Sequence, residues 1–106
     1  MINDEILSIT KRICEAISPK KIYLFGSFAR GDHHKHSDYD FYVIVPDGVG
    51  NPTELCQEAY SSLLGMKRTR GADILVADES TFAKRKEWKT IEREVMEEGL
   101  LLYGNR

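Results

Sequence analysis

Two short polar segments, Gly26-Ser27 and Asp38-Tyr39-Asp40, contain the residue types that could do chemistry in this chain. Ten residues separate Ser27 from Asp38, and an apolar run typical of a β-strand adjoins each segment. Gly26 lets the backbone approach a ligand closely because it has no Cβ, and Ser27 adds a hydroxyl and a free N–H. If a short helix begins here, its unpaired N–H groups and its dipole favour an anion. The first segment is therefore a candidate phosphate-binding turn.

The acidic pair could hold a divalent metal. On a strand, Asp38 and Asp40 would project from one face, roughly 7 Å apart along the backbone. If their charges came within about 4 Å, they would repel by about 4 kcal/mol at an effective dielectric constant near ~20. Mg²⁺ would cancel this repulsion, and it prefers oxygen ligands. Together the two segments predict chemistry on a nucleoside triphosphate.

Each segment also has a purely structural interpretation. Ser27 could be a helix N-cap, and Asp38 could be a turn residue after Ser37. Either motif alone is weak evidence, because Gly-Ser and Asp-x-Asp are both common. Their combination at this spacing, between two apolar strands, is far less expected by chance and favours a functional site.

The joint pattern resembles a known family. Gly26-Ser27, followed after ten residues by Asp38-x-Asp40, is similar to the signature of the nucleotidyltransferase superfamily that includes DNA polymerase beta. The fuller string, Gly-Ser-Phe-Ala-Arg-Gly and then Ser-Asp-Tyr-Asp, resembles the minimal nucleotidyltransferase (MNT) domains, which are partners of HEPN proteins. The resemblance covers nearly the whole chain. It implies an α/β (α+β) polymerase beta-like fold, with residues 1–106 as one small domain whose mixed β-sheet is flanked by helices.

The resemblance also implies a third carboxylate on a later strand, and the matching position is Asp73. Its implied catalytic and metal-binding residues are Asp38, Asp40 and Asp73, and its implied nucleotide-binding residues are Gly26, Ser27 and Arg30. Two Mg²⁺ ions would be held, with ATP as the substrate. Asp73 could act as a general base or only as a metal ligand.

Three functions follow from the resemblance. The first is a Mg²⁺-dependent enzyme that transfers AMP from ATP to a hydroxyl, a tyrosine of a HEPN toxin, so that the chain acts as an antitoxin. The second is a non-catalytic MNT-like module that masks a HEPN ribonuclease by contact. The third is a small-molecule adenylyltransferase of the aminoglycoside type, which generally needs extra protein to hold the drug. Three carboxylates together favour the first, since a pure binder would not need them, and no residue pattern identifies the base.

Composition and charge agree with a small soluble domain. The chain has 106 residues, of which 42% are hydrophobic and 30% charged. A net charge of −2 argues against a dedicated nucleic-acid binder. No apolar run could span a bilayer and no amino-terminal signal is recognisable, so we expect a cytoplasmic protein that does not bind membranes. Cys14 and Cys56 fall on apolar stripes of expected helices, which predicts buried thiols.

Helical and strand patterns alternate along the chain. A first helix, capped by Asn3 or Asp4 and ended by Ser18-Pro19, has an isoleucine face consisting of Ile2, Ile6, Ile9, Ile13 and Ile17. Strands are expected at 21–25, 40–45 and 71–76, with a short one at 100–103. A middle helix begins with Asn51-Pro52-x-Glu54 and has Leu55, Ala59, Leu63 and Met66 on one face. A long last helix starts at Ser80 near Asp78, turns Phe82, Trp88, Ile91 and Val95 inward, and stops at Gly99.

Three histidines, His33, His34 and His36, lie in the polar loop between the two motifs. They invite a zinc interpretation, but the loop lacks both a fourth ligand and the i, i+4 spacing of a helical site. We therefore expect solvated histidines.

The arginines near the motifs have two interpretations each. Arg30, one helical turn after Ser27, could reach a phosphate or pair with a carboxylate of the sheet. The basic loop of Lys67, Arg68 and Arg70 could attract an anionic substrate, although a solvated loop is the expectation.

Overall fold

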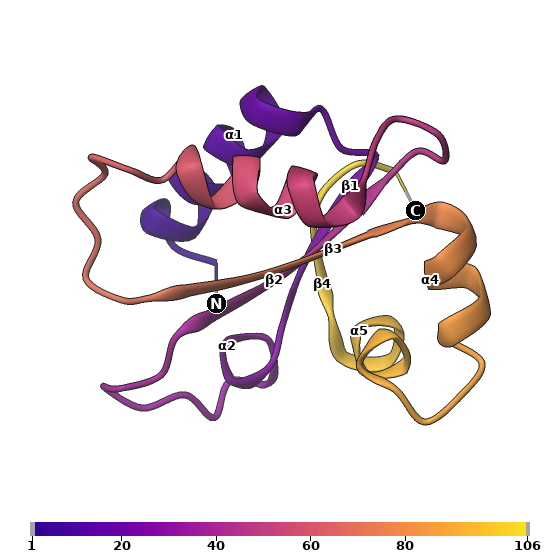
Figure 1. Cartoon of the computed structure of the whole chain (residues 1–106). Coiled ribbons are helices and arrows are strands. Elements are labelled where there is room, and N and C mark those ends of the chain that lie inside the picture. Colours follow the sequence, from indigo (N-terminus) through magenta and orange to yellow (C-terminus); the bar gives the residue numbers. More distant parts are fainter. Residues whose placement is uncertain (1, 106) are drawn as a thin grey trace.

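The computed structural model describes residues 2–105, in which helices and strands alternate except that α4 is followed directly by α5 (Figure 1). The elements are α1 (Asp4–Ile17), β1 (Lys21–Phe25), α2 (Ser27–Arg30), β2 (Tyr39–Val45), α3 (Pro52–Ser61), β3 (Ala72–Asp78), α4 (Glu79–Arg85), α5 (Ile91–Glu98) and β4 (Leu100–Tyr103). The four strands form one sheet in the order β3-β2-β1-β4. β1 pairs antiparallel with β2 and β4, whereas β2 and β3 are parallel. Parallel neighbours need a crossover connection, and α3 supplies it.

The helices cover both faces of the sheet. α1 and α3 lie on one face, and α4 and α5 lie on the other, with α2 beside them at the end of β1 (Figure 1). Both faces of β2 are buried, because Phe41, Val43 and Val45 pack toward α1 and α3. Tyr42 and Ile44 pack toward the opposite side with Phe82 of α4 and Val95 of α5. This is the mixed sheet flanked by helices that the sequence predicts.

The first helix follows the isoleucine pattern except at its start. The side chain of Asn3 accepts a hydrogen bond from the N–H of Ile6 and caps α1. The isoleucines inside the helix, Ile6, Ile9, Ile13 and Ile17, are buried. Ile2 lies before the cap and is 43% exposed, so its expected place on the buried face is wrong.

The expected long last helix is wrong, because two helices occupy its place. α4 ends at Arg85 and α5 begins at Ile91, after Thr90, whose side chain caps α5 by accepting from the N–H of Arg93. The break lets Phe82 and Val95 pack on the same face of the sheet. Trp88, in the connection, is 71% exposed and Ile91 is 46% exposed, so neither points inward as expected.

The two cysteines are free and only half-buried, so the prediction of buried thiols is partly wrong. Cys56 Sγ donates a hydrogen bond to the carbonyl oxygen of Ile74 at 3.3 Å. Burial raises the pKa of both thiols, which keeps them protonated near neutral pH. Within residues 2–105, no helix is both long enough and apolar enough to cross a membrane.

A partly buried polar cluster joins β2 to the two last helices. The hydroxyl of Tyr42 donates to Glu92 Oε2 at 2.8 Å, and Arg85 Nε donates to Glu92 Oε1 at 3.0 Å. Burial alone would raise the pKa of Glu92, but the hydrogen bonds from Tyr42 and Arg85 outweigh it, and the pKa is lowered. Because Tyr42 lies two residues after Asp40 on β2, this cluster holds α5 over the strand that contains the acidic pair.

Candidate active site

Gly26 brings the end of β1 into contact with the acidic strand. Phe25, the last residue of β1, is the register partner of Asp40. Gly26 follows with φ +76°, and a Cβ at this position would overlap Oδ2 of Asp40. Glycine is therefore required here both for the left-handed backbone and for the close approach of the carboxylate.

Ser27 is the first residue of α2, a helix of a single turn. The cap position is taken by Gly26, so the alternative interpretation of Ser27 as a helix N-cap does not hold. Its side chain is half-buried, and among the residues that the structure describes its hydroxyl forms no side-chain hydrogen bond. The hydroxyl and the first N–H groups of α2 thus remain available beside Asp40.

The three aspartates lie at the same end of two neighbouring strands. Asp40 of β2 and Asp73 of β3 are direct register partners, so their side chains share one face of the sheet. Asp38 comes immediately before β2, and its carboxylate occupies the space beside Gly71, where a Cβ would lie 2.9 Å from Oδ1. The pairing of β2 with β3 thus brings Asp73 to the same end of the sheet as Asp38 and Asp40, which are two positions apart in the sequence.

Burial and the neighbouring charges affect the carboxylate of Asp40. Burial, followed by the charges of Asp73, Asp38 and Glu94, raises the pKa of Asp40 to about 6, and the Arg30 guanidinium opposes the increase. Asp38 and Asp73 are exposed, whereas Asp40 is half-buried. A half-buried carboxylate whose pKa is raised by burial and by neighbouring negative charges is typical of a functional site. Glu94 of α5 belongs to this electrostatic environment, although no sequence motif pointed to it.

The raised pKa predicts how stability depends on pH. As the pH falls from about 7 to 4, the folded protein takes up a proton on Asp40 before the unfolded chain does, so the contribution of Asp40 to the free energy of unfolding becomes more favourable. We expect Asp40→Asn to be more stable than the wild type at pH 7 by about 1 kcal/mol, after allowance for solvent screening. This gap should close near pH ~4, where the wild-type carboxyl is neutral.

Urea denaturation with a chelator present, at several pH values, measures this gap. Glu58→Gln is the control, because it removes an exposed charge from α3, away from the aspartates. A gap for Asp40→Asn that stays constant between pH 7 and pH ~4 would contradict the assignment.

The donor atoms at this site suit Mg²⁺. All three side chains offer carboxylate oxygens, and their mutual repulsion is the kind that a divalent cation relieves. Among the described residues, no three His, Cys, Asp or Glu side chains are already grouped closely enough to hold an ion together. The chemistry of the donors and the raised pKa of Asp40 support the fit.

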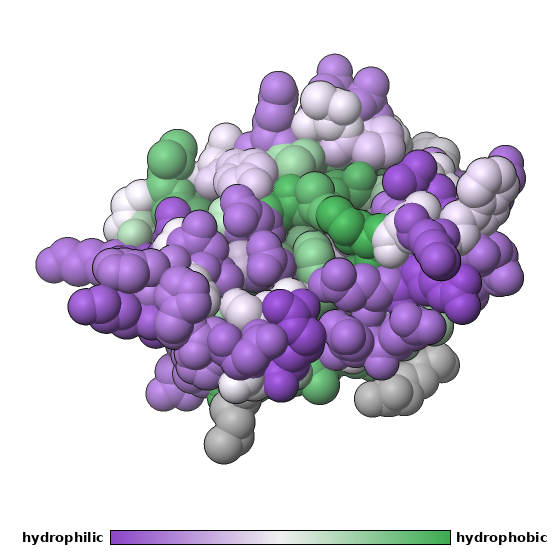
Figure 2. All heavy atoms as spheres, turned by 90° about the horizontal axis from the view of Figure 1, so that it is seen from below, coloured by the Kyte–Doolittle hydropathy of each residue, from purple (hydrophilic) through white to green (hydrophobic). Residues whose placement is uncertain are grey.

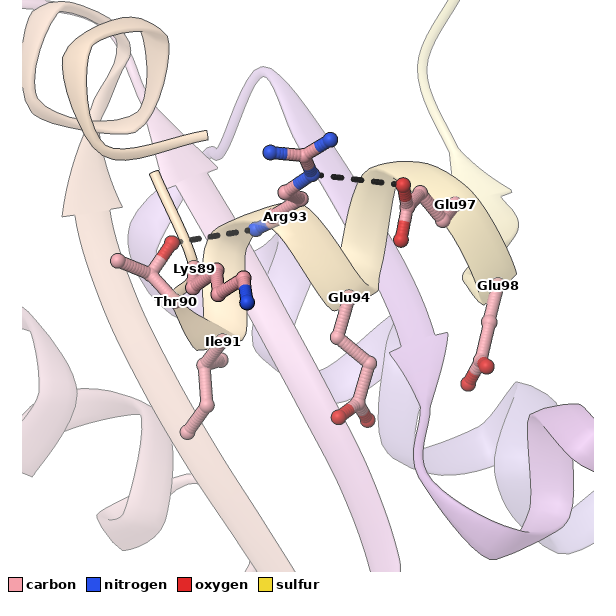
Figure 3. Close-up of a pocket in the computed structure, with 7 residues that line it drawn as sticks. All are labelled: Lys89, Thr90, Ile91, Arg93, Glu94, Glu97 and Glu98. Atoms are coloured by element: carbon pink, nitrogen blue, oxygen red, sulfur yellow. Dashed lines mark hydrogen bonds and ion pairs between the residues drawn. The ribbon is translucent and has the colours of Figure 1, made fainter. Parts of the chain in front are cut away.

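Arg30 pairs with carboxylates, but they are not those of the sheet. Its Nε lies 3.1 Å from Asp32 Oδ2, and its Nη1 lies 3.6 Å from Glu94 Oε2 and 3.7 Å from Glu98 Oε2. Figure 3 shows Glu94 and Glu98 projecting from the same side of α5, away from the pair formed by Arg93 and Glu97. Arg30 therefore connects α2 to α5 beside Asp40.

An open hollow of about 530 Å³ lies along α5. Its lining residues are Lys89, Thr90, Ile91, Arg93, Glu94, Glu97 and Glu98 (Figure 3). None of the three aspartates lines it, and its connection to them is Glu94. Seen from the side of α2 and α5, the surface has apolar atoms near its centre and hydrophilic ones around them (Figure 2).

The histidines are exposed, as the solvated interpretation predicts. His33 stacks on Phe28, with ring centroids 4.0 Å apart, and His34 meets His36 edge to face at 6.3 Å. In the part of the chain that the structure describes, no group of ligands suitable for zinc includes them. Lys67 and Arg68 are exposed too. Arg70 differs, because it is half-buried and donates hydrogen bonds to two backbone carbonyls, so the expectation that it is solvated is wrong.

Comparison with known proteins agrees with this geometry. The family described as nucleotidyltransferase domain matches residues 6–102. A protein from Methanocaldococcus jannaschii, named as a putative protein adenylyltransferase, is 36% identical over 84 residues, which are 79% of this chain and 78% of the relative. The chain therefore belongs to the nucleotidyltransferase domain family.

Solved structures are similar across nearly the whole chain. One is a toxin-antitoxin structure with AMP-PNP, 25% identical, with a TM-score of 0.54 over 94% of this chain and 74% of that one. Another is a mutant of the toxin-antitoxin MntA-HpeT, 26% identical, with a TM-score of 0.57 over 100% of this chain and 76% of that one. The polymerase beta-like fold and the resemblance to MNT domains are confirmed, whereas the roles of the individual site residues stay predictions.

Proposed function

We propose that this chain is a Mg²⁺-dependent adenylyltransferase that transfers AMP from ATP to a tyrosine of a HEPN toxin and so acts as its antitoxin. The observation that carries the proposal is that Asp38, Asp40 and Asp73 lie at the same end of β2 and β3, where Asp40 is beside the Gly26-Ser27 turn. The relative named as a putative protein adenylyltransferase supports the reaction, and the toxin-antitoxin structures support the partner. The solved neighbour with AMP-PNP supports ATP as the donor.

The residues have distinct proposed roles. Gly26 and Ser27 bind the β- and γ-phosphates through backbone N–H groups and the hydroxyl, since the first N–H groups of a helix have no partner within the helix. Asp38, Asp40 and Asp73 hold Mg²⁺, which when bound neutralises the triphosphate and lowers the pKa of the acceptor hydroxyl. Arg30, held by carboxylates of α5, adds positive charge beside the phosphates.

The reaction is an in-line displacement at the α-phosphorus. The acceptor oxygen forms a bond to this atom, and the bond between the α-phosphorus and the bridging oxygen breaks. Pyrophosphate leaves with the electron pair, and the proton of the hydroxyl passes to the exposed carboxylate of Asp73. AMP remains on the acceptor. We place the protein in the cytoplasm, where thiols such as its two free cysteines stay reduced.

The test is to incubate the purified chain with a HEPN partner, ATP and Mg²⁺ and to measure the intact mass of the partner. We expect an increase by one or more AMP units, located on a tyrosine by peptide mapping and lost when a chelator is added. A partner that keeps its mass but loses ribonuclease activity in a stoichiometric complex would favour the masking module instead. Transfer to an aminoglycoside, with none to the partner, would favour the small-molecule enzyme.

A further inference from the structure

Arg70 connects the loop between the two motifs to the rest of the molecule. This loop, residues 31–38, runs from α2 to the start of β2 and has no regular secondary structure. Arg70 Nη1 donates to the carbonyl oxygen of His34 and to that of Ser37, each at 2.9 Å. These two residues begin and end a turn, because the N–H of Ser37 donates to the same oxygen of His34 at 3.0 Å. A single guanidinium therefore holds both ends of the turn.

The same side chain also contacts α2. Its guanidinium carbon lies 4.9 Å from the centroid of the Phe28 ring, a cation–π contact. Phe28 is only 3% exposed and immediately follows Ser27. Arg70 thus touches both the helix that begins at the phosphate-binding turn and the loop that leads to Asp38.

The residue after Arg70 completes the arrangement. The carbonyl oxygen of Gly71 accepts a hydrogen bond from the N–H of Tyr39 at 3.0 Å, and its missing side chain leaves space for the Asp38 carboxylate. The backbone on both sides of Asp38 is therefore held by consecutive residues, Ser37 by Arg70 and Tyr39 by Gly71. Both of these residues directly precede β3, the strand of Asp73.

We propose that Arg70 is a positioning residue that fixes Asp38 relative to Ser27 and Asp73. The proposal rests on the function proposed above, because it assigns Arg70 a role in that same site. An arginine suits this task, since its planar guanidinium can stack on a ring and donate hydrogen bonds at once, whereas a lysine ammonium cannot stack in this way. Arg70 does not contact the substrate in this role, so its loss should affect turnover more than nucleotide binding.

The expected result concerns Arg70→Met. A displacement of about 1 Å can cost about 100-fold in rate, so we expect kcat to fall by about 10- to 100-fold. The KM for ATP should change by less than about threefold, because phosphate binding is left to other residues. Without nucleotide, amide hydrogen exchange in residues 32–38 should be faster by about tenfold or more, with α1 unchanged.

Two further variants complete the experiment. Lys67→Met removes a positive charge from the basic loop that also contains Arg70. Its kcat and amide exchange should match the wild type, because Lys67 is exposed and forms no hydrogen bond or ion pair in the described part of the chain. Arg70→Lys keeps the positive charge but cannot stack on Phe28 as a planar group. Its kcat and amide exchange should lie between those of the wild type and those of Arg70→Met. It also provides a measurement if Arg70→Met does not fold.

The outcomes separate this inference from the proposed function. The positioning role would be overturned if Arg70→Met kept both the amide exchange rates and the kcat of the wild type. If only Arg70→Lys folds, the same result for that variant would overturn the role. A raised KM with unchanged kcat would overturn it too, because Arg70 would then bind the triphosphate directly. If the wild-type protein transferred no AMP, the proposed function would fail, while the exchange measurements would still decide whether Arg70 fixes the loop.

Discussion

Replacing Asp38 and Asp40 together by asparagine is expected to abolish transfer of label from α-labelled ATP, with a loss of about 1,000-fold or more. A metal ion supplies several kcal/mol of stabilisation in the transition state, and each ~1.4 kcal/mol corresponds to a tenfold change in rate. Asparagine keeps the size of the side chain but removes the charge that would hold the cation. The measurement is the initial rate of label transfer to the partner at saturating Mg²⁺.

The same variant should remain folded and should resist urea better than the wild type at neutral pH, because the repulsion around Asp40 is removed. This separates loss of the site from loss of the fold. The matched control is Glu15→Gln with Glu58→Gln, which removes two exposed charges from α1 and α3 and should keep full activity. Substantial transfer by the aspartate variant would contradict the assignment of these residues.

Gly26→Ala is expected to damage both stability and activity. The Gly26 backbone, with φ +76° and ψ −155°, lies in a region almost restricted to glycine, and holding another residue there costs about 1–3 kcal/mol. The new Cβ would also overlap Asp40 Oδ2, so we expect a total loss of about 2–3 kcal/mol in the free energy of unfolding. Because the Asp40 carboxylate must move aside, transfer should fall by about 100-fold.

Gly65→Ala is the matched control for this variant. Gly65 lies in the turn after α3, has φ +80°, and has no neighbouring atom within 4 Å of the place that a Cβ would occupy. Its substitution should lower the free energy of unfolding only by the cost of the positive-φ backbone, about 1 kcal/mol, and leave the transfer rate unchanged. If Gly26→Ala and Gly65→Ala gave equal stabilities and equal rates, the close contact between Gly26 and Asp40 would have no functional importance.

The sequence predicts the local parts of this site well, because they depend on neighbours in the chain. The spacing of Gly26, Ser27, Asp38 and Asp40, and the apolar runs beside them, are local properties, and the structure has strands next to both motifs. Asp73 is different. Its pairing with Asp40 joins residues 33 positions apart across a parallel crossover, and no spacing rule predicts that register. Its position was expected only through the resemblance to the family.

The interactions that the sequence does not predict are those of charged side chains with distant partners. Glu92 resembles any solvated helix residue, yet it is 7% exposed and bonded to Tyr42, which is 50 positions away. Arg70 similarly resembles a solvated loop cation but binds carbonyls 33 and 36 positions away. The local charge pattern of a solvated side chain is the same as that of a side chain bound to a distant partner, so only the tertiary fold distinguishes the two. The helix break before Thr90 had one local signal, a threonine suited to capping a helix.

β3 is one of the two edge strands of the sheet, and this has a consequence for the acceptor of the proposed reaction. Asp73 is exposed on that border strand, whereas Asp40 is half-enclosed one strand further in. In the proposed transfer, an acceptor that approaches from the flank of the sheet would therefore reach Asp73 before Asp40. Such lateral access suits an acceptor that is itself a folded protein, since it would need to insert only a single hydroxyl-bearing side chain.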